Sequence, residues 1–313
     1  MKLNFSFGKD LYMLTAKMIK EAAAKYGACL CGIGSLDIFE GENIQRDPKM
    51  ILPAAKCIIG FGFPVPKALY NTMDRGVQTM QYTTMGVKYI DEEFTEIFLF
   101  RLGAMIEDAG YDACLQRSVP GMTIKGDKRT NPEVLDTYEL ALAEPVEEGK
   151  PAPDVMIDFA KAARACGIGY AGKSGHILAP KYGPYIRYCF IVTDAPLELD
   201  EPLTDSICDN CGLCENACPG KAISDEGIDT WQCAVYYKGA HKSNPLMNDE
   251  FLKGNPDREA ILNGEYRFDA ESARKLYPEL KKFLPEFKGY APCLCGKKCD
   301  KACFDHLKEV GRI

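Results

Sequence analysis

The stretch that decides the fold of this chain is Cys208-Asp209-Asn210-Cys211-Gly212-Leu213-Cys214-Glu215-Asn216-Ala217-Cys218-Pro219. Its four cysteines follow the spacing C-x2-C-x2-C-x3-C-P. At this spacing the first three thiolates bind one 4Fe-4S cluster, and the fourth, which precedes the proline, binds the other cluster of a two-cluster ferredoxin fold. A zinc site is the alternative, but zinc sites are usually built from paired C-x2-C units. The spacing therefore predicts iron–sulfur clusters.

A partner group of cysteines lies near the C-terminal end of the chain, at Cys293, Cys295, Cys299 and Cys303. Its last spacing matches that of the first group, but Phe304 stands where the first group has a proline, and Cys295 and Cys299 are one residue further apart. A lone Cys233 lies between the groups, and a buried free thiol is the alternative interpretation of it. Two clusters need eight thiolates and nine are present, so we expect one spare thiol, Cys293.

The composition is that of a globular protein. The chain has 313 residues, of which 46% are hydrophobic and 27% charged, and it carries 15 cysteines. A chain of this length buries a sizeable core without disulfides, and collagen-like, disordered and repeat proteins are excluded. The net charge of −7 argues against nonspecific duplex binding. The sequence has no apolar run of membrane-spanning length and no signal-peptide pattern. We expect a soluble, cytoplasmic protein. Thiols stay reduced in the cytoplasm, so clustered cysteines there are more often metal ligands than disulfides.

Residues 1–199 predict an α/β domain. Helical spacing over 10–26 precedes an expected strand at 29–34, and further strands are expected at 57–63 and 187–193. Two more helices are expected, a long one at 89–109 and a shorter one at 156–165. Strands that alternate with helices favour a partly parallel sheet covered by helices. The stretch 121–153 is rich in Gly, Pro, Lys and Glu and is expected to form an exposed, lid-like loop.

Residues 200–313 predict a second domain. Cysteine density rises after residue 200, and the spacing above favours a ferredoxin-like domain that holds two clusters. The polar stretch that begins at 238 separates the two cysteine groups, and we interpret 238–290 as an insertion. Six further cysteines have no ligand spacing and are interpreted as small buried hydrophobic residues; they are Cys29, Cys31, Cys57, Cys114, Cys166 and Cys189.

Three stretches before the cysteine motif, and one near the start of the chain, carry a family resemblance. They are Gly167-Ile168-Gly169-Tyr170-Ala171-Gly172-Lys173-Ser174-Gly175, Ala179-Pro180-Lys181-Tyr182-Gly183-Pro184-Tyr185-Ile186-Arg187, Thr193-Asp194-Ala195-Pro196-Leu197-Glu198 and 46–56. Through these stretches the chain resembles the family that contains epoxyqueuosine reductase and the corrinoid reductive dehalogenases. The similarity extends over most of the chain and is weakest in 64–150 and 238–290.

The resemblance implies a fold, cofactors and a reaction. A nitroreductase-like sheet domain would bind cobalamin, and two 4Fe-4S clusters in the ferredoxin-like domain would pass low-potential electrons to it for the reduction of an organic substrate. One cluster would be held by Cys208, Cys211, Cys214 and Cys303, and the other by Cys218, Cys233, Cys295 and Cys299. The extra residue before Cys299 departs from the family spacing. Ferredoxin or flavodoxin would be the electron donor, and tRNA is a partner only by family analogy.

The glycine-rich turn is the candidate corrinoid site. Its glycines would let the backbone approach a flat ring, and Lys173 would pair with a corrin amide or the cofactor phosphate. His176 is expected to support the site rather than to bind cobalt. The alternative is a tight helix–strand connection, for which glycine is the usual residue. The candidate cofactor-binding residues are Gly167, Gly169, Gly172, Lys173, Ser174, Gly175 and His176.

The resemblance also suggests catalytic residues. Arg187 matches an arginine that polarises the substrate site of the dehalogenases, and Asp154, with Asp158 as a competitor, matches an aspartate of the epoxyqueuosine reductases. Tyr138 is a third candidate proton donor. The Asp-x-x-Pro segment of epoxyqueuosine reductases is missing, so the substrate stays open. Two other functions remain as alternatives, a two-cluster electron-transfer protein without corrinoid and an RNA-modifying reductase.

Overall fold

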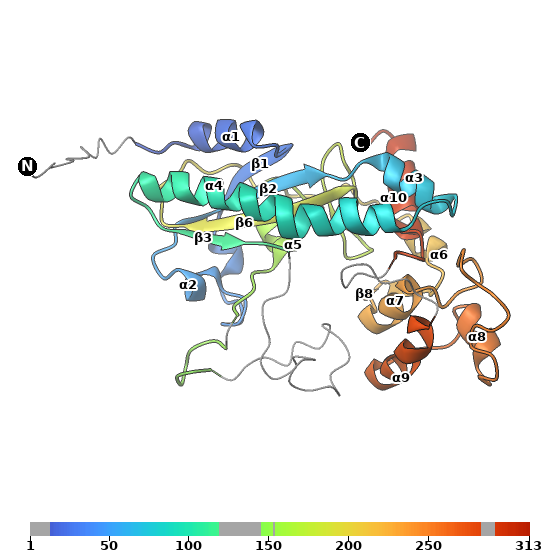
Figure 1. The fold of residues 1–313 in the computed structure, drawn as a ribbon. Helices are drawn as coiled ribbons and strands as arrows, with labels where there is room; N and C mark the ends of the chain where they lie inside the picture. Colours follow the sequence, from blue (N-terminus) through green and yellow to red (C-terminus); the bar gives the residue numbers. More distant parts are fainter. Residues whose placement is uncertain (1–12, 119–144, 153, 283–291) are drawn as a thin grey trace, which may run out of the picture.

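The computed structural model describes residues 13–118, 145–152, 154–282 and 292–313. A four-stranded sheet with helices on both faces occupies one end of the molecule, and a helical, cysteine-rich part occupies the other (Figure 1). The strand order is β1 (Leu30–Ser35), β2 (Cys57–Pro64), β6 (Ile186–Thr193) and β3 (Ala113–Gln116). The strands expected at 29–34, 57–63 and 187–193 are therefore confirmed.

All three strand pairs of this sheet are antiparallel, so the prediction of a partly parallel sheet is wrong. The error has a physical cause. Long apolar runs such as 57–63 are typical of parallel strands because both faces of such strands are buried. Here β2 is also buried on both faces, but between antiparallel neighbours: Phe61 faces one hydrophobic core, and Ile58 faces another on the opposite side of the sheet.

Helices cover both faces of the sheet. On one face, α1 (Ala16–Lys25) and α4 (Thr95–Asp108) contribute Ile19 and Leu102, neither of which is exposed. On the other face lie α5 (Phe159–Ala165), α2 (Pro48–Ile51) and the short η1 (Asp37–Phe39). The helices expected at 10–26 and 156–165 are confirmed in their described parts, although both begin later than predicted. Thr15 caps α1 and Asp158 caps α5 through hydrogen bonds to backbone N–H groups.

The long helix expected at 89–109 is confirmed as an α-helix from Thr95 onward. Its first part belongs to η2 (Tyr82–Phe94), a π-helix that runs directly into α4. The helix α3 (Lys67–Asp74) precedes it. A π-helical turn is rare and often marks a functional region. In this chain the π-helix supplies Tyr82 and Asp91, which are both buried.

The cysteine-rich part is built from short elements. A hairpin of β4 (Tyr170–Ala171) and β5 (Ile177–Leu178) leads to it, and a second hairpin consists of β7 (Ile223–Ser224) and β8 (Gly227–Ile228). Its helices are α6 (Leu213–Ala217), α7 (Thr230–Tyr237), α8 (Arg258–Leu262), α9 (Ala270–Lys281) and α10 (Lys298–Glu309). Of the helices that the structure describes, none has the length and apolar character needed to span a bilayer.

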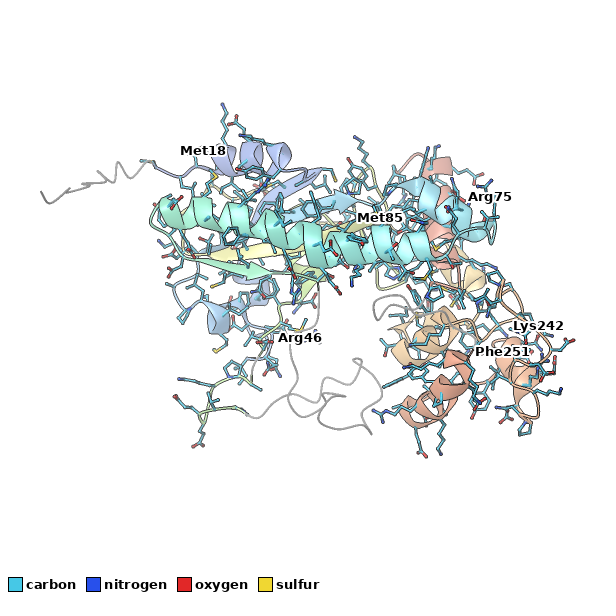
Figure 2. All side chains as sticks on the ribbon, viewed as in Figure 1. Met18, Arg46, Arg75, Met85, Lys242 and Phe251 are labelled. Atoms are coloured by element: carbon cyan, nitrogen blue, oxygen red, sulfur yellow. The ribbon has the colours of Figure 1, made fainter. Side chains whose placement is uncertain are left out.

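The expected insertion at 238–290 contributes a small hydrophobic core rather than only polar loop. Phe251, labelled in Figure 2, is 1% exposed and packs with residues of α7, α8 and α9. Hydrophobic periodicity in this region is interrupted by turns, which is why the sequence pattern did not indicate a core. Residues 283–291 lie outside the described part of the chain.

Helix α10 returns the C-terminal cysteines to the first cysteine motif. It packs against α6 and against α3 (Figure 1). A stack of three aromatic rings holds it to the sheet part, since Tyr185 stacks on Tyr70 at 3.7 Å and on Phe304 at 4.1 Å between ring centroids. The two parts therefore contact each other closely. The division near residue 200 stays a prediction, as does the lid, of which residues 121–144 and 153 lie outside the described ranges.

Candidate functional site

Four cysteines line a cavity between α6 and α10. We call Cys208, Cys211, Cys214 and Cys303 the first thiol group. The first two lie in the loop before α6, the third in the first turn of α6, and Cys303 in α10. Gly212, with φ +76°, turns the loop into α6, a conformation that favours glycine. The cavity has about 290 Å³ of space free of protein atoms, part of it open to solvent.

A second cavity is lined by the other predicted set. We call Cys218, Cys233, Cys295 and Cys299 the second thiol group. Cys218 follows α6, Cys233 lies in α7, Cys295 precedes α10 and Cys299 lies in its first turn. This cavity has about 420 Å³ of free space, also partly open to solvent, and His176, Tyr237 and Lys297 contribute to its lining.

The pKa values of Cys303 and Cys233 are each affected by other thiols of their own group. The pKa of Cys303 is raised to about 12, mainly by burial and to a smaller extent by the nearby Asp300 and the other three thiols of the first group. Burial likewise raises the pKa of Cys233 to about 11, with contributions from Cys295 and Cys218 of its own group. Metal binding to such thiols must displace protons, so it is coupled to proton release. Sets of four converging sulfur donors suit soft metal centres such as iron–sulfur clusters and zinc.

Each thiol group draws on both cysteine motifs. Cys218 of the first motif faces the second group, whereas Cys303 of the last motif faces the first group. This is the exchange of the fourth cysteine that a two-cluster ferredoxin motif implies. The structure therefore brings the eight thiols together in the two sets of four that the resemblance implies. That they bind clusters stays a prediction.

Cys293 lines neither cavity. It is fully buried, and its backbone N–H donates a hydrogen bond of 3.1 Å to the Thr83 hydroxyl. Its sulfur lies 3.7 Å from that of Cys295, and it packs with Tyr70 and Tyr82 in a hydrophobic cluster. This position agrees with its interpretation as the spare thiol.

The remaining six cysteines lie in or beside the sheet. Cys57, Cys166 and Cys189 are buried, and the other three are half-buried. Burial raises the pKa of Cys57 to about 11 and that of Cys31 to about 12. Thiols of this kind are protonated at neutral pH and behave as small apolar side chains.

The glycine turn is filled by the protein itself. A Cβ at Gly172 would lie 2.7 Å from the Leu178 side chain, and Gly175 has φ +75° with Ile228 3.2 Å from the place of a Cβ. The space beside Gly167 and Gly169 is likewise occupied by neighbouring protein atoms, and Ser174 is buried. These contacts account for the glycines as a tight connection. The role of residues 167–175 at a corrinoid stays a prediction.

Lys173 and His176 of the same turn face different cavities. Lys173 lines the first cavity and pairs with Glu215 at 2.9 Å and Asp225 at 2.7 Å. Hydrogen bonds to these two carboxylates raise the pKa of Lys173. His176 lines the second cavity. The hairpin β4–β5 is therefore fastened between the two thiol groups, and the cofactor roles expected for Lys173 and His176 stay predictions.

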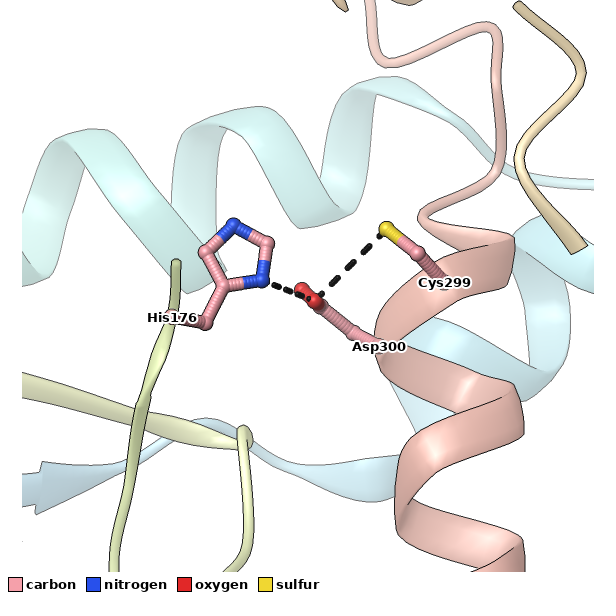
Figure 3. Close-up of side chains that lie close together, drawn as sticks. All are labelled: His176, Cys299 and Asp300. Carbon is pink, nitrogen blue, oxygen red and sulfur yellow. Dashed lines mark hydrogen bonds and ion pairs between the residues drawn. The ribbon is translucent and has the colours of Figure 1, made fainter. Parts of the chain in front are cut away.

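A buried carboxylate lies beside the second cavity. Asp300 is 5% exposed in its side chain and lies 2.5 Å from Nδ1 of His176 and 3.5 Å from Nζ of Lys297. Figure 3 shows the imidazole of His176 and the sulfur of Cys299 both directed at this carboxylate. Burial opposes the charge on Asp300, but His176 and Lys297 outweigh it and hold its pKa well below the usual range. Sequence reasoning missed Asp300 and Lys297, although the widened spacing before Cys299 marked the place.

Arg187 is held in a two-point ion pair with Asp91 of the π-helix. Its Nε donates to one carboxylate oxygen at 3.0 Å, and its Nη2 donates to the other. Asp91 is only 5% exposed in its side chain, and it was not expected as a partner. Burial opposes the charge on Arg187, but Asp91 prevails and raises its pKa. The predicted role of Arg187 at a substrate stays a prediction.

Of the three candidate proton donors, the structure describes two, Asp154 and Asp158, and neither lines either cavity. Asp158 accepts hydrogen bonds from the N–H groups of Ala160 and Lys161 as the cap of α5, so it has a structural role. Asp154 is exposed, and its backbone carbonyl accepts a bond of 2.9 Å from Gln45. Tyr138 lies outside the described residues.

Comparison with known proteins confirms the resemblance. The epoxyqueuosine reductase of Bacillus subtilis is 26% identical over 222 residues, which are 70% of this chain and 48% of that protein. The enzyme of Lactococcus garvieae is 26% identical over 238 residues, which are 75% of this chain and 56% of that protein. This chain is similar to epoxyqueuosine reductases. It spans about half the length of these relatives.

Solved structures agree at the level of the fold. A catabolic reductive dehalogenase matches with a TM-score of 0.50 at 15% identity, over 88% of this chain and 39% of that protein. The common fold mixes helices and sheet. No family model matches the chain.

Proposed function

We propose that this chain is an iron–sulfur reductase in which the first and second thiol groups each hold one 4Fe-4S cluster. The observation that carries the proposal is the convergence of eight cysteines, from segments up to 95 positions apart in the sequence, on two cavities of four thiols each. Zinc is the competing occupant. The exchange of Cys218 and Cys303 between the motifs favours iron–sulfur clusters, because it is a property of the two-cluster spacing.

The residues of the chain would do three things around the clusters. The eight thiols would release protons as they bind metal. The Lys173 ion pairs would fasten the β4–β5 hairpin between the two sites, and the ring stack at Tyr185 would hold α10 against the sheet. The clusters themselves would supply one-electron transfer at low potential. Fixed cavities of this kind limit rearrangement when an electron arrives.

The acceptor of these electrons would be a cobalamin that reduces an organic substrate. Support comes from the similarity to epoxyqueuosine reductases and from the family stretches in the sequence. The glycine turn at residues 167–175 would be its binding place, although tight packing also accounts for these glycines. We derive no step through the cofactor. A ferredoxin or flavodoxin would be the donor, and tRNA is a substrate only by analogy with the curated relatives.

A second candidate function is a two-cluster electron-transfer protein without corrinoid. It is favoured by one observation, the occupation of the glycine turn by Leu178, Ile228 and Glu201. Both functions use the same eight thiols. They differ in whether a corrinoid binds.

Titration with cobalamin separates the two functions. The full chain is reconstituted anaerobically with iron and sulfide, and the visible bands of cobalamin are followed as it is added. Saturable binding that also occurs in Lys275→Met, an exposed surface variant, supports the corrinoid reductase. No binding to protein that carries both clusters would leave the electron-transfer function in its place. Absence of clusters after reconstitution would overturn both.

A further inference from the structure

The second cavity contains a lysine that the cluster motif does not require. Lys297 lies between Cys295 and Cys299, at the point where the spacing is one residue wider than in the first motif. Its side chain is 19% exposed and lines the cavity together with all four thiols of the second group. Burial of an ammonium costs hydration free energy. A lysine at this place beside four sulfur ligands therefore needs a favourable interaction that offsets this cost.

The backbone at Lys297 is unfavourable for a lysine. Its φ is +47°, and Gly296 before it has φ +66°. A left-handed conformation is readily adopted by glycine but is disfavoured for residues with a Cβ. A glycine or asparagine at 297 would form the same turn with less strain. The chain therefore holds a lysine where turn geometry alone does not favour one, and strain of this kind clusters at functional sites.

Two opposite charges lie beside the sulfurs of the second thiol group. The Lys297 side chain lines the cavity together with the four thiols. The Asp300 carboxylate lies 3.8 Å from the Cys299 sulfur. Nζ of Lys297 lies 3.5 Å from the Asp300 carboxylate. Both charges of this ion pair therefore lie beside the second thiol group, and they act on it in opposite directions. The N-terminus of the 12-residue helix α10 adds positive potential at the same place.

We propose that Lys297 is a positioning residue for electron transfer, whose ammonium raises the reduction potential of the cluster held by the second thiol group, with Asp300 as the counter-charge that holds it there. The inference rests on the proposed function. Reduction adds one electron, and therefore one negative charge, to the cluster. A nearby cation stabilises the reduced form more than the oxidised form, and a nearby anion does the reverse. The low dielectric of a buried site strengthens both effects.

The test uses two variants with opposite charge changes. Lys297→Met and Asp300→Asn are prepared in the full chain and reconstituted anaerobically. The reduction potential of each cluster is measured by redox titration with electron paramagnetic resonance. The signal of the second cluster is identified as the one lost in Cys233→Ala. All potentials are measured at one pH.

The two variants should shift the potential of the second cluster in opposite directions. Lys297→Met should lower it by the equivalent of at least a tenfold change in the reduction equilibrium constant, which is about 59 mV for a one-electron couple. Asp300→Asn should raise it. Lys297→Arg keeps a cation and should stay closest to the original potential. Lys308→Met removes an exposed lysine from the same helix and should leave both potentials unchanged.

The outcomes distinguish this inference from the function on which it rests. If both clusters assemble and the second potential does not move, or moves in the same direction in both variants, the inference is wrong and the proposed function stands. If the original chain assembles no clusters, the proposed function is wrong and the inference falls with it. Should Lys297→Met fail to assemble its second cluster, Asp300→Asn and Lys297→Arg still decide the sign of the effect.

Discussion

Arg187 shows how a residue marked as catalytic by resemblance can also hold two elements together. It lies on β6, and its partner Asp91 lies on the π-helix η2. Both oxygens of the carboxylate accept hydrogen bonds from the guanidinium. A planar two-point contact of this kind fixes the relative position of its partners better than a single bond. The pair therefore anchors an unusual helix to the central sheet.

Removal of the arginine should destabilise the protein rather than act on turnover alone. In Arg187→Met the buried carboxylate of Asp91 is left without its charged partner, which typically costs about 3–5 kcal/mol. The double variant Arg187→Met, Asp91→Leu should lose less than the sum of the single losses, because no charge remains buried alone. Urea unfolding of the reconstituted protein under anaerobic conditions measures these differences.

A matched control for this prediction is Lys275→Met. Its ion pair with Glu271 on α9 is exposed at both ends, and exposed pairs contribute little to stability. The free energy of unfolding should stay unchanged in this variant. Additive losses at Arg187 and Asp91, or no loss at either, would contradict the structural role of the pair.

Two cysteines from different elements, Cys233 in α7 and Cys293 in the segment before α10, differ in their position relative to the second cavity. Cys233 of α7 lines the second cavity, whereas Cys293 lies beside that cavity without lining it. Both thiols are largely shielded from solvent, so solvent exposure does not distinguish the ligand from the spare thiol. Their positions relative to the second cavity distinguish them.

Cys233→Ala should lose one cluster, and Cys293→Ala should keep both. The first change removes one of four sulfur ligands, and the second removes only a packed side chain. Iron content per chain after anaerobic reconstitution provides the measurement, with the original chain as the reference. Loss of iron in Cys293→Ala alone would make Cys293 the ligand and Cys233 the spare thiol. Equal loss of iron in both variants would contradict the assignment of Cys293 as the spare thiol.

The same elements show what the sequence made predictable. Strands with continuous apolar runs and the C-x2-C-x2-C-x3-C-P motif have strong local patterns, so β1, β2, β6 and the expectation of clusters followed from them. The assignment of the cysteines to two sets of four came from the family resemblance. The direction of the strands did not follow, because two-sided burial produces the same pattern in parallel and antiparallel sheets. The pairs Arg187–Asp91 and Asp300–His176 did not follow either. Their members lie 96 and 124 positions apart in the sequence, and side-chain pairs at such separations leave no local signal.

On the scale of the whole molecule, the cysteine-rich part and the sheet part depend on each other. The ring stack of Tyr70, Tyr185 and Phe304 joins α3, α10 and the residue directly before β6. The Lys173 ion pairs join the β4–β5 hairpin to α6 and to the β7–β8 turn. Cluster assembly in the cysteine-rich part should therefore stabilise the sheet part as well, since binding that occurs only in the folded state stabilises that state.

The measurement that tests the central claim most directly is the content of iron and acid-labile sulfide in the full chain after anaerobic reconstitution. Eight thiols in two groups of four predict about eight iron atoms and about eight sulfides per chain. Cys211→Ala, which removes an exposed ligand of the first group, should reduce both numbers to about four. About four of each in the original chain, or zinc in place of iron, would contradict the two-cluster account.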